Sequence, residues 1–124
     1  MFETPQQVYE HLLSRAPENK MEPRMQPMRD IMTLLGEPQT SAPVIHLTGT
    51  NGKTTTARII EQVLIAHGLR TGRYTSPHLS KVTERISLDG QPVDDETFVR
   101  IFNEIAPLVD IIDAQLESAG EQKL

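Results

Sequence analysis

Residues 48–56 read Thr48-Gly49-Thr50-Asn51-Gly52-Lys53-Thr54-Thr55-Thr56, and the apolar run Pro43-Val44-Ile45-His46-Leu47 precedes them. The residues that follow, Ala57 to His67, carry a helical pattern of apolar side chains. A β-branched run that stops at a glycine, followed by a helix with hydroxyls in its first turn, leaves free backbone N–H groups and a positive helix end facing one point. That point suits a phosphate group.

The individual residues of this loop suit the same ligand. Gly49 and Gly52 allow the backbone to turn sharply and to approach an anion closely. Lys53 supplies a point charge, and Thr54 and Thr55 can offer oxygen to a magnesium ion. The stretch therefore predicts a strand, a phosphate-binding loop and a helix.

The match to the common phosphate-loop motif is incomplete. That motif has four residues between its first glycine and its Gly-Lys pair, and the residue at the position of the first glycine here is Leu47. A glycine turn capped by threonines is therefore an alternative. The order of strand, two glycines, lysine and hydroxyls favours phosphate binding.

Composition limits the possible functions. The 124 residues allow one small domain, and the formal charge of −5 offers no general attraction to nucleic acid or to anionic membranes. The chain has no cysteine, which excludes disulfides and thiolate metal sites. No apolar run approaches the ~20 residues that span a bilayer, and the first residues lack a secretion signal. We therefore expect a cytoplasmic protein with no nucleic-acid or membrane partner.

The segment before the glycine loop, residues 1–42, predicts a helical lead-in. Thr4 and Pro5 are typical of an N-cap and a first helical residue, and this first helix is expected to end near Ser14. Apolar residues then recur at helical spacing from Met25 to Leu35, with Gly36 in the position of a C-terminal cap.

The segment 43–75 predicts strand, loop, helix and second strand. Gly68 ends the helical pattern, and residues 70–75 read as the second strand. A strand, a crossover helix and another strand imply a right-handed unit with a parallel sheet and a ligand at the carboxyl ends of the strands. We therefore expect an α/β nucleotide-binding domain with a parallel sheet core, in which the helix is buried against that sheet.

The remaining segments are a polar loop with a hairpin, residues 76–93, and a long helix, residues 94–118. Asp89-Gly90 is a hairpin-turn signal between two short strand patterns. Asp94 and Asp95 can cap the long helix, and Pro107 is expected to kink it.

Some polar residues after the second predicted strand are candidates for chemistry. Ser76 would project beside the phosphate loop and could bind magnesium, although a serine before proline is also a common turn cap. His78 could contact phosphate or substrate. Glu84 and Arg85 form either a solvated ion pair or, in the case of Arg85, a site for an anionic substrate.

Four segments, in this order and spacing, resemble one enzyme family: Leu35-Gly36-Glu37-Pro38, His46-Leu47-Thr48-Gly49-Thr50-Asn51-Gly52-Lys53, Thr75-Ser76-Pro77-His78-Leu79 and Glu84-Arg85-Ile86. They look like the amino-terminal part of folylpolyglutamate synthase and of the bifunctional dihydrofolate synthase/folylpolyglutamate synthase, within the Mur ligase superfamily. The resemblance runs from about Met25 to Leu108. The third and fourth segments select the folate branch.

The resemblance implies roles for residues of both loops. Ser76 matches the family's magnesium-binding serine in an omega-like loop, and Thr54 is a second candidate metal ligand. Lys53 would be catalytic, neutralising charge on the transferred phosphoryl group. The ATP-binding residues would be Gly49, Thr50, Asn51, Gly52, Lys53, Thr54 and Thr55, and the folate or pterin loop would contribute Ser76, Pro77, His78 and Arg85.

One departure concerns the residues after the lysine. Folate enzymes commonly have glycine and then serine there, whereas this chain has Thr54-Thr55-Thr56, which is more similar to the cell-wall ligases. By position, Thr55 matches the family serine.

The chemistry implied by the resemblance is ATP-dependent amide formation. With magnesium and ATP, the carboxylate of a folate or of dihydropteroate becomes an acyl phosphate, and L-glutamate displaces the phosphate. The family's proteins are over three times this length, and their glutamate-binding domain, adenine pocket and later metal ligands are not in these residues. We therefore expect a fragment of a monomeric enzyme, without ligase activity of its own. The alternatives are a Mur cell-wall amino-acid ligase and, if the natural chain ends at Leu124, a non-catalytic nucleotide-binding module.

Overall fold

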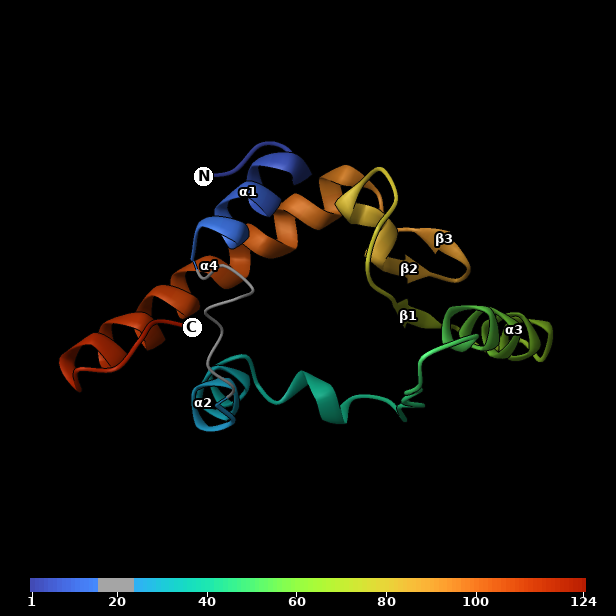
Figure 1. Ribbon diagram of the computed structural model, residues 1–124, viewed down its shortest axis with the longest axis horizontal. Coiled ribbons are helices and arrows are strands. Elements are labelled where there is room, and N and C mark those ends of the chain that lie inside the picture. The colour runs from blue at the N-terminus through green and yellow to red at the C-terminus, as the bar shows by residue number, and fades with distance from the viewer. Residues whose placement is uncertain (16–23) are drawn as a thin grey trace. The chain divides into compact units, whose positions relative to one another are not determined.

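The computed structural model describes residues 1–15 and 24–124. The chain divides into two compact units, one of Met1–Pro43 with Val99–Leu124 and the other of Val44–Phe98. We call them the helical unit and the loop unit. Figure 1 shows the elements coloured in chain order. Across the described ranges, no helix combines the length and the apolar character needed to cross a membrane.

The helical unit contains α1 (Pro5–Arg15), α2 (Gln26–Leu34) and most of α4 (Asp95–Ser118). The predicted cap of α1 is confirmed, because Thr4 Oγ1 accepts a hydrogen bond of 3.2 Å from the Gln7 N–H. Gly36 follows α2 with a φ of 84°, the left-handed conformation expected of a glycine after a helix end. A short 3-10 helix, Pro38–Thr40, comes next.

The core of the helical unit lies between α2 and the carboxyl-terminal half of α4. Ile31, Ile112 and Leu116 are buried there, and partly buried apolar residues pack around them: Leu35, Leu108, Val109 and Leu124. The apolar residues in the carboxyl-terminal half of α4 therefore face a core. Pro107 lies inside α4, whose bounds run past it to Ser118, and the predicted kink stays a prediction.

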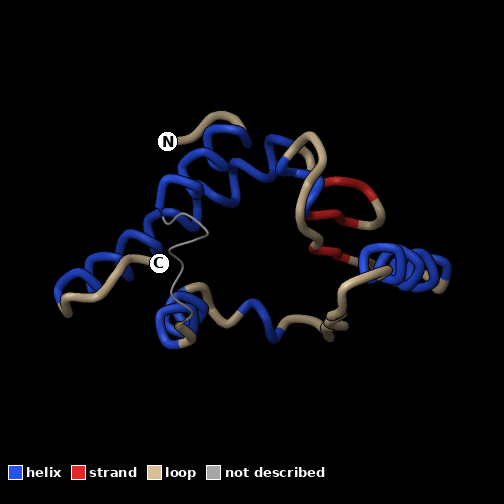
Figure 2. The backbone as a smooth tube through the Cα atoms, in the orientation of Figure 1, coloured by secondary structure: helices blue, strands red, loops and turns tan. Residues whose placement is uncertain are grey.

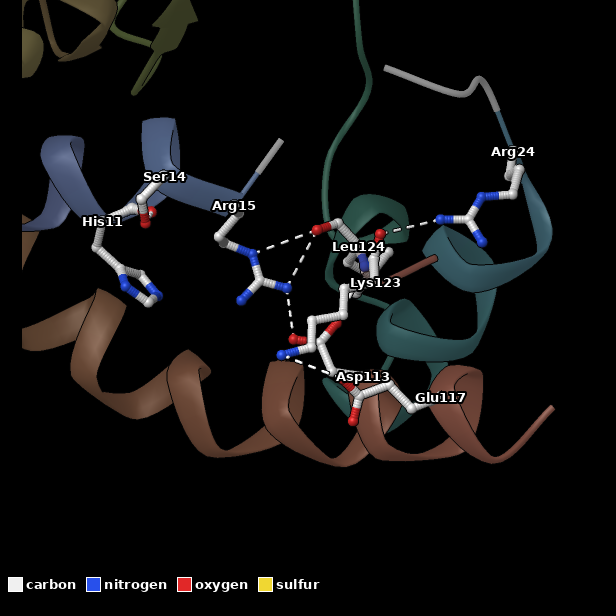
Figure 3. Close-up of polar contacts among 8 residues, drawn as sticks. All are labelled: His11, Ser14, Arg15, Arg24, Asp113, Glu117, Lys123 and Leu124. Carbon is white, nitrogen blue, oxygen red and sulfur yellow. Dashed lines mark hydrogen bonds and ion pairs between the residues drawn. The ribbon is translucent and has the colours of Figure 1, made fainter. Parts of the chain in front are cut away.

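A buried ion pair also joins α1 to α4. The Arg15 guanidinium lies 2.5 Å from Asp113 Oδ2, and the two side chains are 14% and 9% exposed. Figure 3 shows Arg15 pointing from α1 toward Asp113 on α4, and the guanidinium also donates two hydrogen bonds to the Leu124 main-chain oxygen. Near the amino terminus, the main chain of Phe2 makes two hydrogen bonds with the side-chain amide of Asn103 on α4.

The loop unit contains α3 (Lys53–Ala66) and three short strands, β1 (Gly72–Tyr74), β2 (Ile86–Leu88) and β3 (Gln91–Pro92). The strands form one sheet in the order β1-β2-β3, and both pairings are antiparallel. The predicted hairpin is confirmed. Asp89 and Gly90 take φ values of 50° and 85°, which are the positive values that a tight two-residue turn between β2 and β3 requires.

The predicted parallel pairing is wrong for the described part of the chain. Residues 43–47 are not a strand, and Figure 2 draws the segment before α3 as a loop. Val44 and Ile45 are 78% and 61% exposed. A β-branched run has strand propensity, but it becomes a strand only when a neighbour accepts its hydrogen bonds, and β1 is paired with β2 instead.

The expected burial of α3 is also wrong. Glu61 is the buried residue of this helix, whereas Ile59 and Val63 are 59% and 50% exposed. The reason is that the sheet is small: within the loop unit, α3 meets the β1 end of a three-stranded sheet, which covers only one side of the helix.

Candidate functional site

The start of α3 has the open geometry expected of an anion site. Gly49 and Gly52 take φ values of 142° and 76°, and a Cβ atom at either position would meet nothing within 4 Å. Gly52 caps the helix without a side-chain hydrogen bond. The Thr56 N–H is bonded to the Gly52 oxygen at 2.9 Å, and the helix N–H groups before it have no intrahelical acceptor.

Charge at this helix start favours an anion. The first turn of α3 contains no acidic residue, and it begins with Lys53, whose side chain is exposed. The threonines that follow are exposed as well. The residues present therefore fit a phosphate group: free N–H donors, a positive helix end and one ammonium converge on an accessible surface.

The polar loop of the predicted segment 76–93 covers residues 76–85, where the chain leaves the sheet after β1 and returns to it at β2. Its two ends are held together, because the Thr75 N–H donates to the Arg85 oxygen at 2.9 Å beside the paired strands. A 3-10 helix, Val82–Arg85, forms its second half, and a cis peptide bond joins Ser76 to Pro77.

Glu84 is the internal anchor of this loop. Its carboxylate accepts hydrogen bonds from the N–H groups of Leu79 (2.9 Å), Ser80 (3.3 Å) and Lys81 (3.2 Å), and from the Ser80 hydroxyl (2.9 Å). These donors, the Leu79 N–H first among them, lower the pKa of Glu84 from 4.5 to about 2. Glu84 therefore stabilises the conformation of the loop backbone. The residues around it in the sequence did not predict this role.

His78 and Arg85, two of the predicted substrate residues, are in contact. Arg85 Nε donates to His78 Nδ1 at 2.8 Å, and both residues are partly buried. A guanidinium can only donate, so Nδ1 accepts this hydrogen bond. The structure thus joins these two residues, while Ser76 and Pro77 are exposed at the start of the same loop.

A buried polar network in the loop unit was missed by the sequence analysis. Arg73 of β1 lies 3.1 Å from Glu61 of α3, with side-chain exposures of 12% and 5%. The same guanidinium donates to Ser87 Oγ of β2 at 3.2 Å and to Thr75 Oγ1 at 3.4 Å. The available signal was a charge at an inward position on each element: Glu61 within the apolar stripe of the helix and Arg73 in the middle of a strand.

A hollow of about 520 Å³ adjoins this network. Residues of α3, of the sheet and of the 76–85 loop line it: Arg58, Glu61, Gln62, Arg73, Leu79, Glu84, Ser87, Gly90 and Pro92. Its wall therefore contains side chains of both signs of charge beside apolar ones.

A metal site of carboxylates and imidazoles is not present in residues 1–15 and 24–124, where no three such side chains cluster. The predicted metal ligands are the hydroxyls of Thr54 and Ser76, and both residues are exposed in the loop unit. Two hydroxyls suit magnesium only when a nucleotide supplies further oxygens, because magnesium takes six oxygen ligands and keeps several waters.

Comparison with known proteins gives a consistent result. No protein-family model matches the chain. The dihydrofolate synthase/folylpolyglutamate synthase of Mycobacterium tuberculosis is 48% identical over 114 residues, which are 90% of this chain and 23% of that protein.

Two solved structures resemble the chain as well. Folylpolyglutamate synthase of M. tuberculosis complexed with ADP matches with a TM-score of 0.85 at 42% identity, over 95% of this chain and 26% of that one. Escherichia coli FolC in complex with DHPP and ADP matches with a TM-score of 0.77 at 28% identity, over 86% and 25%. The chain thus spans about a quarter of the length of the proteins it resembles, and it belongs to the folylpolyglutamate synthase/dihydrofolate synthase family.

Proposed function

We propose that this chain is the ATP-binding part of a ligase that adds L-glutamate to the carboxylate of a folate or of dihydropteroate. The observation that carries the proposal is the open start of α3, where two glycines with positive φ and Lys53 meet free helix N–H groups. The ADP in the complexes of two similar proteins supports a nucleotide as the ligand. The DHPP in one of them supports a pterin substrate.

The nucleotide would be held mainly by backbone. Gly52 and the first turn of α3 offer N–H groups to its phosphates, and Lys53 adds the charge. The ATP-binding residues are proposed to be Gly49, Thr50, Asn51, Gly52, Lys53, Thr54 and Thr55. Thr54 and Ser76 are proposed to contribute hydroxyl oxygens to the magnesium ion that accompanies the nucleotide.

The 76–85 loop would hold the carboxylate substrate. Arg85 is proposed to bind the carboxylate, because a planar guanidinium matches a carboxylate in geometry and charge, and His78, which it contacts, is proposed to lie beside the same group. Ser76 and Pro77 stand at the amino-terminal end of this surface. The Glu84 bonds to the loop backbone keep the surface in one conformation.

The catalytic contribution of these residues would be positional and electrostatic. Magnesium-ATP, when bound, supplies the phosphoryl group that activates the substrate carboxylate. Lys53 offsets negative charge on that group, and the helix N–H groups orient it. Arg85 and His78 would hold the acceptor. No side chain in either loop needs to act as a nucleophile.

In this proposal the segments keep their predicted order, without the strand predicted at residues 43–47. Residues 1–42 lead into a nucleotide-binding domain, 43–75 carry its phosphate loop and helix, 76–93 form the omega-like loop and hairpin, and 94–118 form the long helix. The chain is then the first part of a phosphate-loop domain. Its parent would act on small molecules as a monomer.

The proposal is tested with a protein that carries this chain together with the segments that its relatives have in addition. We expect ADP formation that depends on L-glutamate and on dihydropteroate or a reduced folate. The chain alone is expected to form no ADP under the same conditions. ADP formation that requires a UDP-muramoyl peptide instead would contradict the proposal, and so would the absence of ADP formation with every folate acceptor.

A further inference from the structure

The Glu61–Arg73 ion pair has no part in the chemistry proposed above, yet it is the most buried pair of charges in the described residues. The two side chains are 5% and 12% exposed, with 3.1 Å between Glu61 Oε2 and Arg73 Nε. For comparison, Arg100 and Glu104 form an ion pair of the same length on α4 with exposures of 59% and 65%. Burying two charges is costly unless they are paired and further hydrogen-bonded.

The Arg73 guanidinium meets that condition in one particular orientation. Its Nε faces Glu61, one terminal nitrogen donates to Ser87 Oγ and the other to Thr75 Oγ1. A planar guanidinium that is held along three directions fixes its partners relative to one another. A buried ion pair of this kind often adds little to the free energy of unfolding. Its better-supported effect is to favour one arrangement of the helix and the strand that bear the two residues.

Apolar packing gives only part of the constraint on α3. Ile60, Leu64 and Ile65 are partly buried, but Ile59 and Val63 are 59% and 50% exposed, and Glu61 is the buried residue of the helix. The second contact of this helix with the hairpin lies at Gly90, where an added Cβ would be 3.3 Å from Gln62 Nε2 and 3.4 Å from Ile65 Cδ1. The polar network therefore adds a directional contact between α3 and the sheet to these apolar ones.

The two partners are close in sequence to the two halves of the proposed magnesium-nucleotide site. Glu61 is eight residues after Lys53 on the same helix, which corresponds to about 12 Å along the axis. Arg73 is three residues before Ser76, and Thr75, which the guanidinium also contacts, is adjacent to Ser76. The network thus connects the helix that begins at Lys53 to the strand that ends just before Ser76.

We propose that Glu61 and Arg73 are positioning residues that set Ser76 at the correct distance from the start of α3, so that one magnesium-nucleotide contacts both. The inference rests on the proposed function, since it assumes a nucleotide at α3 and a metal at Ser76. Neither Glu61 nor Arg73 touches the ligand in this arrangement. Their effect is transmitted through the position of β1 relative to α3.

The inference separates two parts of the nucleotide affinity. Binding of metal-free ADP uses the loop and the helix start, which the network does not touch. The gain in affinity that magnesium adds requires Ser76 at the right distance. Loss of the network is therefore expected to remove most of the magnesium-dependent gain. The ADP affinity in the presence of magnesium should fall roughly tenfold or more, as is typical when a group that orients a metal ligand is lost.

The test measures ADP affinity of the full chain by calorimetry, once with excess magnesium and once with a chelator. The variants are Arg73→Met, Glu61→Gln and the double variant Glu61→Leu/Arg73→Met, which replaces the pair by apolar side chains and leaves no buried charge alone. Arg73→Lys is included because a lysine can pair with Glu61 but cannot also reach Ser87 and Thr75. Arg100→Met is the matched control, since it removes an exposed ion pair.

The expected result is that the double variant keeps the chelator affinity and loses the magnesium-dependent gain. Arg73→Lys should restore part of that gain, and Arg100→Met should behave as the unchanged chain. Far-UV circular dichroism identifies any single variant that fails to fold, and the double variant then decides the question. A folded double variant that keeps the full gain overturns the inference, and so does an equal loss of both affinities, which indicates a merely structural pair. If the unchanged chain binds no ADP, the proposed function fails first, and the inference fails with it.

Discussion

Lys53 is the charged side chain of the 48–56 loop, and it is exposed at the first position of α3. A charge-assisted hydrogen bond is worth about 1.5–3 kcal/mol, so Lys53→Ala should weaken ADP binding by roughly 10- to 100-fold. The measurement is a calorimetric titration of both proteins. Lys123→Ala is the control, because Lys123 pairs with Glu117 in the helical unit, and it should leave the affinity unchanged. Equal weakening by both substitutions would point to non-specific charge attraction instead.

Glu84 makes stability depend on acid pH. Its pKa is lowered from 4.5 to about 2 by hydrogen bonds to the charged carboxylate. A lowered folded-state pKa contributes stability that is complete above the ordinary value and is lost as the pH falls through the folded value. The chain should therefore be more stable than Glu84→Gln near neutral pH, and the difference should shrink between about pH 4.5 and about 2. Urea unfolding at a series of pH values measures it.

The control for this experiment is Glu121→Gln, at an exposed residue after α4. It should follow the pH dependence of the unchanged chain. A stability difference between Glu84→Gln and the unchanged chain that stays constant down to pH 2 would mean that the loop bonds do not depend on the carboxylate charge.

At the level of elements, the hairpin turn at Gly90 lies close to side chains of α3. An alanine there would hold a left-handed conformation at φ 85° and would also meet Gln62 and Ile65 at 3.3 and 3.4 Å. Gly120 has a similar φ of 74° with nothing within 4 Å of an added Cβ. Both substitutions share the conformational cost of about 1–2 kcal/mol, so Gly90→Ala should lower the free energy of unfolding more than Gly120→Ala. Denaturant unfolding of the two variants that gives equal losses would exclude a close approach of α3 to the turn.

The elements that the sequence predicted correctly depend on residues near one another in the chain. The cap of α1 needs Thr4 and Gln7, the hairpin needs Asp89 and Gly90, and the cap of α4 uses a bond of 2.7 Å from the Thr97 N–H to Asp94 Oδ1. Such signals are local, because a cap or a turn is made of groups within a few residues.

The features that the sequence did not predict correctly depend on partners far along the chain. The run 43–47 has the composition of a strand, but strand formation depends on a neighbour that composition cannot specify. The Arg73–Glu61 bond joins residues 12 apart on different elements, and its partners were visible only as charges in apolar patterns. For the candidate site, the structure shows open space around Gly49 and Gly52 and a hydrogen bond between Arg85 and His78. The ligand contacts of these residues remain predictions.

At the scale of the whole molecule, the proposed site residues all belong to the loop unit, whereas the Arg15–Asp113 pair belongs to the helical unit. Arg15→Met leaves the Asp113 carboxylate buried without its partner, which should lower the free energy of unfolding by about 3 kcal/mol. ADP affinity should stay unchanged, because the loop unit keeps all its contacts. Chemical unfolding and calorimetry on the same preparation test both statements. A loss of affinity as large as that of Lys53→Ala would mean that the site depends on the helical unit.

The most direct single test of the proposed function is a calorimetric measurement of the dissociation constant of magnesium-ATP for this chain. We predict saturable binding that weakens when Lys53 becomes alanine, and that weakens again in the presence of magnesium when Ser76 becomes alanine. No saturable binding, or equal dissociation constants for the unchanged chain and for both variants, would contradict a phosphate site at the start of α3.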